Sequence, residues 1–296
     1  MKKHSTLKHA EPYIWMLPSM VLMCVMIVIP IVTVFRLSMS KISKAGVVKG
    51  FNGFENFKTI LESPTFIHIL VNTLVWTIAV VGISTLLGFI LAMVLNQPFK
   101  GRKFVRAVVV FPWATSLIIQ ALVWKYMLNA DYGALNVLLV KLGIAHSYIN
   151  WFATWQSTFA WECWVGIFVT VPFVTFCVLS GLQSIDSSFY EAAEIDGAGF
   201  WKKLTRITLP LVRPSLTVST VLNIIYVFNS FPIIWTISKG APADKTHTLV
   251  TYLYQLAFSN GKSGEAAAVS VIGFLILCVF AGIYMVMTLK AEGSES

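Results

Sequence analysis

The sequence predicts an all-α polytopic membrane protein with six transmembrane helices. Of its 296 residues, 57% are hydrophobic and only 12% are charged, whereas a soluble domain carries about 25% charged residues. The mean hydropathy is +0.76. Long uncharged runs are separated by segments too short to build a soluble core, so residues 1–296 are expected to form a single transmembrane domain.

Six apolar runs are each long enough to cross a bilayer as a helix, which takes about 20 residues. Their approximate ranges are 14–35, 66–95, 104–128, 155–180, 215–237 and 266–289. The first run exceeds the ~7–15 apolar residues of a cleaved signal peptide and is expected to be retained. Pro112, Pro172 and Pro232 lie inside runs, and each removes a backbone donor. We therefore expect kinks there, in segments that face other protein or a cavity.

Basic residues indicate the orientation. Lys100, Arg102, Lys103 and Arg106 crowd into the segment that enters the third run, and such a density is typical of the cytoplasmic side. Six spans then place both termini in the cytoplasm. The net charge of +9 suits anionic lipid headgroups, whereas binding nucleic acid would require a folded basic module that the sequence does not contain.

The four cysteines all fall inside apolar runs, and no two of them have the CxxC spacing. We expect buried thiols, and neither disulfides nor a metal site.

Residues 186–210 interrupt the apolar pattern. Ser188 followed by Glu191 fits a capping box and predicts a helix that starts near Phe189. Acidic residues come early and basic residues late, and Gly197-Ala198-Gly199 separates them, which predicts two short helices joined at an angle. An amphipathic helix on the membrane is one interpretation. Because an anionic membrane would repel the acidic half, a docking element for a partner protein explains the segment better.

The spacing of this segment resembles the EAA motif of ATP-binding-cassette (ABC) importer permeases. The chain has Glu191-Ala192-Ala193, then Gly197, then Ile207-Thr208-Leu209-Pro210, with every spacing of the motif kept. Other segments resemble the maltose-type sugar permeases: GFENFKTIL, FKGRKFVRAVVVFPW, ALVWKYMLNADYGALN, FNSFPIIWTI and VTYLYQLAF. The chain departs from that pattern at Asp186, at residues 239–242 and at Pro232. The last two lie near the outer end of the fifth run, where they bear on substrate choice.

The resemblance implies a type I ABC importer-like permease in the inner membrane of a prokaryote. Such a subunit pairs with a second, similar permease, and an extracytoplasmic binding protein delivers the sugar. Two cytoplasmic ATPase subunits, which use ATP and Mg, would dock on the coupling segment; this chain would bind no cofactor itself. The coupling residues implied are Glu191, Ala192, Ala193, Asp196, Gly197, Ala198, Ile207, Leu209 and Pro210.

The same resemblance implies substrate contacts from the spans before and after the coupling segment. The matching positions are Thr170, Phe173, Asn223, Tyr226, Asn229 and Ser230. Amides and hydroxyls beside aromatic rings suit the hydroxyl groups and apolar faces of a sugar. Interhelical hydrogen bonding and packing are the alternative role for such residues.

Three alternative functions are weaker. An ATPase site is excluded because the Gly-Lys-Ser at 261–263 has Leu256 where a P-loop requires glycine. An ion-coupled carrier would need ionisable groups deep in the spans, and Glu162 and His68 are expected at the interface. No set of catalytic residues for a membrane enzyme is evident. A permease for a non-sugar solute, such as a glycerophosphate-type compound, stays open.

Two interpretations remain for Trp151, Trp155, Trp161 and Trp164, which cluster at the outer start of the fourth run. An interfacial aromatic belt is the simpler one, and stacking of a sugar ring on one or two of them is the other.

Overall fold

The structure is a computed structural model that describes residues 4–293, with side chains described at 13 and 15–284. The chain's ends, for which a cytoplasmic location is predicted, lie outside this range. The chain divides into two compact units, of which the first comprises residues up to Phe66 and from Leu253 onward and the second comprises Ile67–Tyr252.

The first unit pairs helices from the two ends of the chain. Its elements are α1 (His4–Met23), a π-helical turn η1 (Cys24–Val28), α2 (Ile29–Ser38), β1 (Ser40–Ile42), β2 (Val48–Phe51), α3 (Glu55–Leu61), η3 (Gln255–Ser259) and α14 (Ser263–Gly293). β1 and β2 form an antiparallel hairpin in which Ser40 is opposite Phe51. α14 packs on α2 and α3, and Phe35 meets Phe274 edge to face with 6.2 Å between ring centroids.

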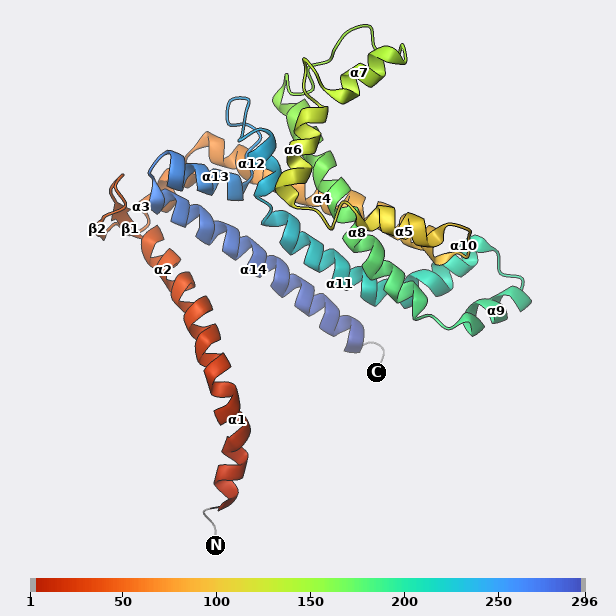
Figure 1. Ribbon diagram of the computed structural model, residues 1–296. Helices are drawn as coiled ribbons and strands as arrows, with labels where there is room; N and C mark the ends of the chain where they lie inside the picture. The colour runs from red at the N-terminus through yellow and green to blue at the C-terminus, as the bar shows by residue number, and fades with distance from the viewer. Residues whose placement is uncertain (1–3, 294–296) are drawn as a thin grey trace. The chain divides into compact units, whose positions relative to one another are not determined.

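The second unit contains the remaining helices (Figure 1). They are α5 (Arg102–Val110), α6 (Leu117–Met127), α7 (Ala134–Lys141), α8 (Trp155–Gln183), α9 (Ser187–Ile195), α10 (Phe200–Lys203), η2 (Leu204–Thr208), α11 (Leu209–Phe228) and α12 (Pro232–Ile237). Two helices cross the boundary between the units in sequence: α4 (Pro64–Asn96) and α13 (Leu249–Tyr254).

The core of the second unit forms around α8, which packs against α11, α12 and α6. Close approach depends on glycines. A Cβ on Gly166 would lie 2.8 Å from the Trp76 ring, and one on Gly88 would lie 2.8 Å from Val174. Trp76 is 1% exposed, and its Nε1 donates a hydrogen bond to the Val227 carbonyl oxygen at 2.9 Å. The Trp76 indole on α4 therefore contacts Gly166 on α8 and the Val227 backbone on α11, and these contacts join the three helices in one core.

Five helical segments among the described residues are long and apolar enough to cross a bilayer: Trp15–Ser38, Pro64–Asn96, Trp155–Gln183, Phe200–Ile237, which contains a short break at 229–231, and Ser263–Tyr284. The prediction of one continuous helix over 104–128 is wrong, because α5 ends at Val110 and α6 begins at Leu117. Pro112 lies in the break, where it removes a backbone donor. Pro232 opens α12 after a second break, whereas α8 continues through Pro172.

The expectation of buried thiols is confirmed for Cys163. Cys177 is half-buried, and the expectation is wrong for Cys24 and Cys278, which are exposed. Both exposed cysteines lie on the outer faces of apolar helices, where a polarizable thiol suits lipid as well as it suits a core.

The interfacial position expected for Glu162 stays a prediction, since burial within the protein is separate from depth in the membrane. Its side chain is fully buried within the second unit. It lies beside the Ser238 hydroxyl, yet neither carboxyl oxygen has hydrogen-bond geometry with a described residue. The packing of Ser238, which follows α12, covers this position on α8.

The tryptophan belt stays a prediction, and the structure shows which of these rings pack together. Trp161 lies 5.3 Å from Trp151 and 6.3 Å from Trp124, measured between ring centroids. Trp151 Nε1 also donates to Asn136 Oδ1 at 3.1 Å.

Candidate functional site

A cavity of about 290 Å³ opens between α8 and α11 in the second unit. Its lining residues are Trp113, Val169, Thr170, Phe173, Leu222, Asn223 and Tyr226. Four of the six predicted substrate residues are thus brought together, because Thr170 and Phe173 are three positions apart on α8 and so are Asn223 and Tyr226 on α11. Residues at this spacing share a helix face.

Asn223 supplies the most distinctive polar group of this cavity. The residue is 1% exposed. Its Nδ2 donates to Ser84 Oγ at 2.9 Å, and Ser84 in turn donates its hydroxyl to the Val81 carbonyl oxygen at 3.2 Å. Because the Ser84 hydrogen is used, its oxygen is an acceptor, which fixes the orientation of the Asn223 amide. Asn223 Oδ1 is left buried without a partner among the described residues.

The other predicted residues of the cavity have different surroundings. Thr170 donates its hydroxyl to the Gly166 carbonyl oxygen at 2.8 Å, so only its lone pairs remain for a ligand. Tyr226 is 47% exposed, and Phe173 contributes an aromatic wall. A buried acceptor beside aromatic rings is an arrangement that can orient a polar molecule with apolar faces.

Asn229 and Ser230 do not line this cavity. Asn229 follows the end of α11, and its side-chain amide donates to the Ile225 carbonyl oxygen at 2.8 Å. Ser230 is 7% exposed, and its hydroxyl has no partner among the described residues. Both lie in the break between α11 and α12, just before Pro232, where the sequence predicts a kink.

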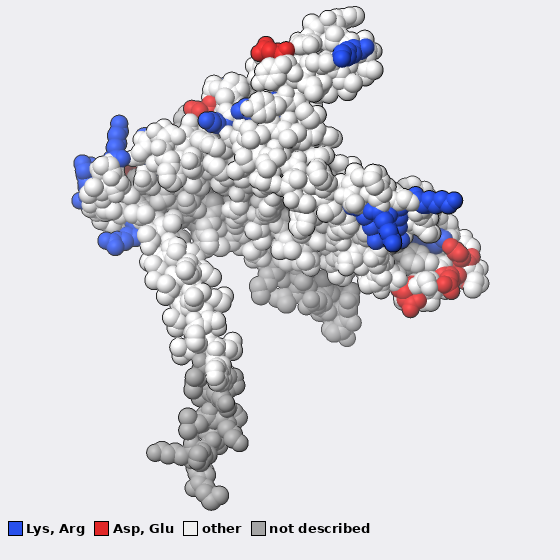
Figure 2. Space-filling view, in the orientation of Figure 1, with Lys and Arg blue, Asp and Glu red and all other residues white. Residues whose placement is uncertain are grey.

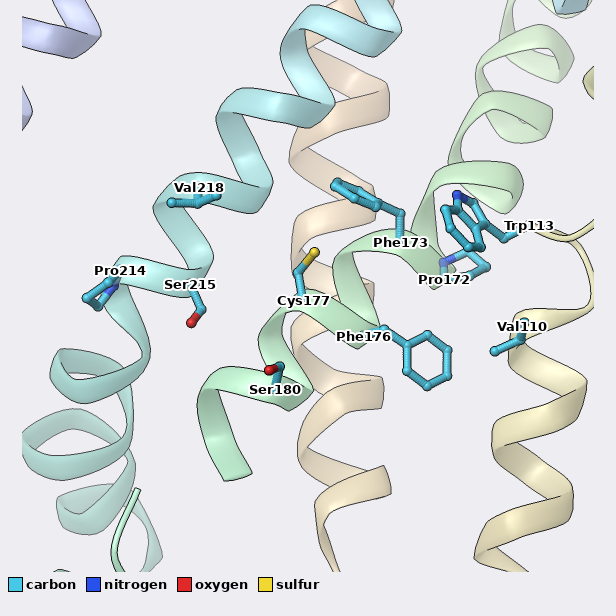
Figure 3. A pocket seen from close by; sticks show the side chains of 10 residues that line it. All are labelled: Val110, Trp113, Pro172, Phe173, Phe176, Cys177, Ser180, Pro214, Ser215 and Val218. Atoms are coloured by element: carbon cyan, nitrogen blue, oxygen red, sulfur yellow. The ribbon is translucent and has the colours of Figure 1, made fainter. Parts of the chain in front are cut away.

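A larger cavity of about 700 Å³ adjoins the first and shares two of its residues, Trp113 and Phe173. Figure 3 shows these two aromatic side chains toward one end of it, with Ser180 and Ser215 toward the other. Its remaining lining residues are Val110, Pro172, Phe176, Cys177, Pro214 and Val218.

Trp113 is the cavity residue that sequence reasoning missed. It lies in the break between α5 and α6. The Pro112 carbonyl oxygen there accepts hydrogen bonds from Gln120 Nε2 at 2.9 Å and from the Thr115 hydroxyl at 3.0 Å. Gln120 is 8% exposed. The available signal was the Pro-Trp pair inside an apolar run, since a proline break exposes the residue that follows it.

The predicted coupling segment contains one short helix, α9, as expected, but the prediction of a second short helix is wrong, because α10, η2 and α11 follow one another without a gap from Phe200 to Phe228, through Pro210 and Pro214. Asp186, and not Ser188, caps the first helix: its side chain accepts from the Ser188 N–H at 2.8 Å, and α9 starts at Ser187. The hydrogen bonds from Ser188 lower the pKa of Asp186. After α9 the chain turns at Gly197 with φ of 69°, a conformation that favours glycine. α10 then begins at Phe200.

Most of the predicted coupling residues lie at the surface. Glu191, Ala192, Asp196, Gly197, Leu209 and Pro210 are exposed, whereas Ala193, Ala198 and Ile207 are half-buried. Sequence reasoning did not select Ile195, which is 88% exposed. Figure 2 shows acidic side chains over this end of the second unit with basic side chains beside them.

Two side-chain contacts tie α9 to the helices that follow it. Tyr190 Oη lies 3.1 Å from Thr208 Oγ1, and Lys203 Nζ lies 2.8 Å from Glu194 Oε1. A cavity of about 520 Å³, lined in part by Tyr190, Glu194 and Lys203 together with Asn96 from the end of α4, lies at this place.

The model of the family "Binding-protein-dependent transport system inner membrane component" matches residues 84–289. This range covers α8, α11 and the 186–210 segment between them. The chain belongs to this family.

Relatives of this permease cover nearly its whole length. It is 43% identical over 283 residues to a probable ABC transporter permease protein of Brucella suis biovar 1, with 96% of this chain and 98% of the relative covered. It is 34% identical over 284 residues to the trehalose/maltose transport system permease protein MalF of Thermococcus litoralis, with 95% of each covered.

Solved structures share the fold of the permease. The crystal structure of a bacterial ABC transporter involved in the import of the acidic polysaccharide alginate matches with a TM-score of 0.83 at 23% identity, covering 97% of this chain and 98% of that chain. A second structure, of a bacterial alginate ABC transporter in complex with an alginate pentasaccharide-bound periplasmic protein, matches with a TM-score of 0.85 at 21% identity and 98% coverage of both chains.

Proposed function

We propose that this permease is one of two membrane subunits of an ATP-driven importer for a sugar or oligosaccharide. The observation that carries the proposal is the cavity between α8 and α11, which is lined by Asn223, whose Oδ1 has no partner among the described residues, together with Trp113, Phe173 and Tyr226. The names of relatives from Thermococcus litoralis (trehalose/maltose) and Streptomyces coelicolor (diacetylchitobiose) support a sugar.

The coupling segment would connect this subunit to ATP hydrolysis elsewhere. Four apolar side chains of this segment are each more than half exposed: Phe189, Ile195, Phe200 and Trp201. The segment itself is held in place by the Asp186 cap and by the two side-chain contacts that join α9 to the helices after it. A rigid element that presents apolar side chains outward is suited to a groove on a second protein. The proposed partners here are two cytoplasmic ATPase subunits, which use the ATP and Mg.

The remaining partners follow from the family. A second permease would complete the pathway, and an extracytoplasmic binding protein would deliver the solute to it. Six crossings, with the broken segment 102–127 as the third, would place both termini and residues 186–210 on the cytoplasmic side. An ion-coupled secondary carrier is disfavoured, because the family is defined by dependence on a binding protein.

Uptake measurements test the substrate site. We expect Asn223→Ala and Tyr226→Ala each to lower sugar uptake by the complete transporter by about five- to tenfold, since losing a hydrogen bond or an aromatic contact costs roughly 1–1.5 kcal/mol. Co-purification with the ATPase should be unchanged in both. Asn229→Ala is the matched control, since its amide is used within its own helix.

Uptake of wild-type strength in both cavity variants would contradict the proposed site. Loss of uptake in Asn229→Ala alone would move the site to the break after α11.

A further inference from the structure

The two adjoining cavities have walls without charge. None of the residues that line them is Asp, Glu, Lys, Arg or His. The polar groups present are neutral: the Asn223 amide, the indole N–H of Trp113, and the hydroxyls of Thr170, Tyr226, Ser180 and Ser215.

This lack of charge bears on the solute. A carboxylate, sulfonate or phosphate taken from water into a membrane-embedded cavity needs a cationic partner, because an unpaired charge is costly to bury. Sites that bind such groups use arginine or lysine. A neutral sugar needs only hydrogen-bonding groups and an apolar surface for its C–H face.

The Trp113 ring lies where it can offer an apolar surface to the C–H face of a sugar. It is 58% exposed although it belongs to an apolar segment, and it lines both cavities together with Phe173. The break that presents it is held by the nearly buried Gln120, which donates to the Pro112 carbonyl oxygen. Phe173, on α8, lines the same space (Figure 3).

We propose that Trp113 is a substrate-contacting residue of this subunit, whose indole supports an uncharged pyranose ring while Asn223 Oδ1 accepts a hydrogen bond from one of the ring hydroxyls. The inference rests on the proposed function and narrows it to uncharged sugars. Gln120 is a positioning residue in this arrangement, since it holds the break and does not line either cavity.

The test uses the complete transporter in proteoliposomes with its binding protein. The probes are two uncharged disaccharides, maltose and trehalose, an acidic one, digalacturonate, and glycerol 3-phosphate. Wild type is compared with Trp113→Leu, which removes the ring, with Trp113→Phe, which keeps a smaller ring, and with Phe104→Leu. Phe104 is 73% exposed on α5 and lines neither cavity, so it is the matched control.

We expect uptake of an uncharged disaccharide and of neither anion. Trp113→Leu should reduce that uptake by about two- to tenfold, in line with the ~0.5–1.5 kcal/mol of an aromatic contact, and raise the apparent KM. Trp113→Phe should retain most of the uptake, and Phe104→Leu should match wild type. Subunit assembly, which a misfolded variant would lose, should be equal in all four proteins, and Phe104→Leu should also keep the basal ATP hydrolysis of wild type.

Transport of either anion, transport of none of the four probes, or wild-type uptake by Trp113→Leu would overturn the inference. The proposed function fails separately, since it is contradicted when Asn223→Ala and Tyr226→Ala transport normally. If those two variants lose uptake and Trp113→Leu does not, the site stands and the role of Trp113 is wrong.

Discussion

His247 lies fully buried in the loop before α13. Its Nδ1 is 3.0 Å from Thr251 Oγ1, and its Nε2 is 3.6 Å from Asp244 Oδ1. Gly240 passes over the ring so closely that a Cβ there would overlap it. Burial lowers the pKa of His247, and the Asp244 carboxylate opposes this only in part.

The sign of the resulting pH dependence follows from linkage. The folded protein binds this proton less readily than the unfolded chain, whose histidine titrates near pH ~6.5. The stabilising contribution is therefore present above about pH 6.5 and is lost as the pH falls below it, by at most about 1.4 kcal/mol per pH unit.

Thermal unfolding of the detergent-solubilised protein between about pH 7.5 and about pH 5.5 measures this effect. We expect a larger fall in Tm for wild type than for His247→Phe, which keeps a ring against Trp235 but does not titrate. Equal falls in the two proteins would show that the imidazole does not govern the acid sensitivity of this loop.

At the scale of residues, the sequence predicted which polar and aromatic side chains share the cavity better than it predicted how buried each side chain is. Thr170, Phe173, Asn223 and Tyr226 were selected by resemblance and share a cavity. The burial of Glu162 could not be predicted, because it depends on Ser238, which is 76 positions away in the chain. Trp113 was missed for a related reason, since its exposure depends on the break that Gln120 holds.

At the scale of elements, the turn between α9 and α10 depends on one backbone conformation. Gly197 has a φ of 69°, and a Cβ there would meet no atom within 4 Å. Gly199 has an ordinary φ of −71° and equal free space. Substituting each of the two glycines by alanine therefore separates the effect of backbone conformation from the effect of side-chain bulk.

We expect Gly197→Ala to weaken co-purification with the ATPase and to lower substrate-stimulated ATP hydrolysis, because an alanine at this φ costs roughly 1–2 kcal/mol. Gly199→Ala is the control and should assemble as wild type does. Equal effects in both variants would instead assign the segment's sensitivity to bulk at the docking surface, and no effect in either would contradict the coupling role.

The helix boundaries also show what hydropathy could not predict, which is where an apolar helix is interrupted. Apolar composition identified the five long helices, but it could not distinguish one helix over 104–128 from α5, a break and α6, because residues 111–116 carry no charge. The proline signal was present at Pro112, Pro172 and Pro232, yet only two of these prolines accompany breaks. A proline inside a helix is tolerated where neighbouring groups satisfy the freed backbone, as the continuous α8 illustrates.

At the scale of the molecule, the core of the second unit depends on the contact of α4 with α8 at Gly166. A Cβ there would lie 2.8 Å from Trp76 and 3.1 Å from Val80, and Trp76 is also fixed by its hydrogen bond to Val227. We expect Gly166→Ala to destabilise the protein by about 1–3 kcal/mol through overpacking.

Gly82→Ala on α4 is the matched control, because a Cβ at Gly82 would meet no atom within 4 Å and alanine favours helix by about 1 kcal/mol. Its Tm should equal or exceed that of wild type, and the Tm of Gly166→Ala should be lower. A Tm that is unchanged in Gly166→Ala would mean that α4 and α8 are free to separate.

The break in the third crossing has a consequence for how the chain is made. α6 has 11 residues, so it is about 16 Å long, against a hydrocarbon core of about 30 Å. It is too short to cross the bilayer alone, and the elements that pack on it, α7, α8 and α12, are all synthesised after it. α12 follows by about 100 residues, which is about 5–20 s at ~5–20 residues per second. We therefore expect the insertion machinery to retain this segment until α12 has been made, a waiting step that a protein with six uninterrupted spans would not need.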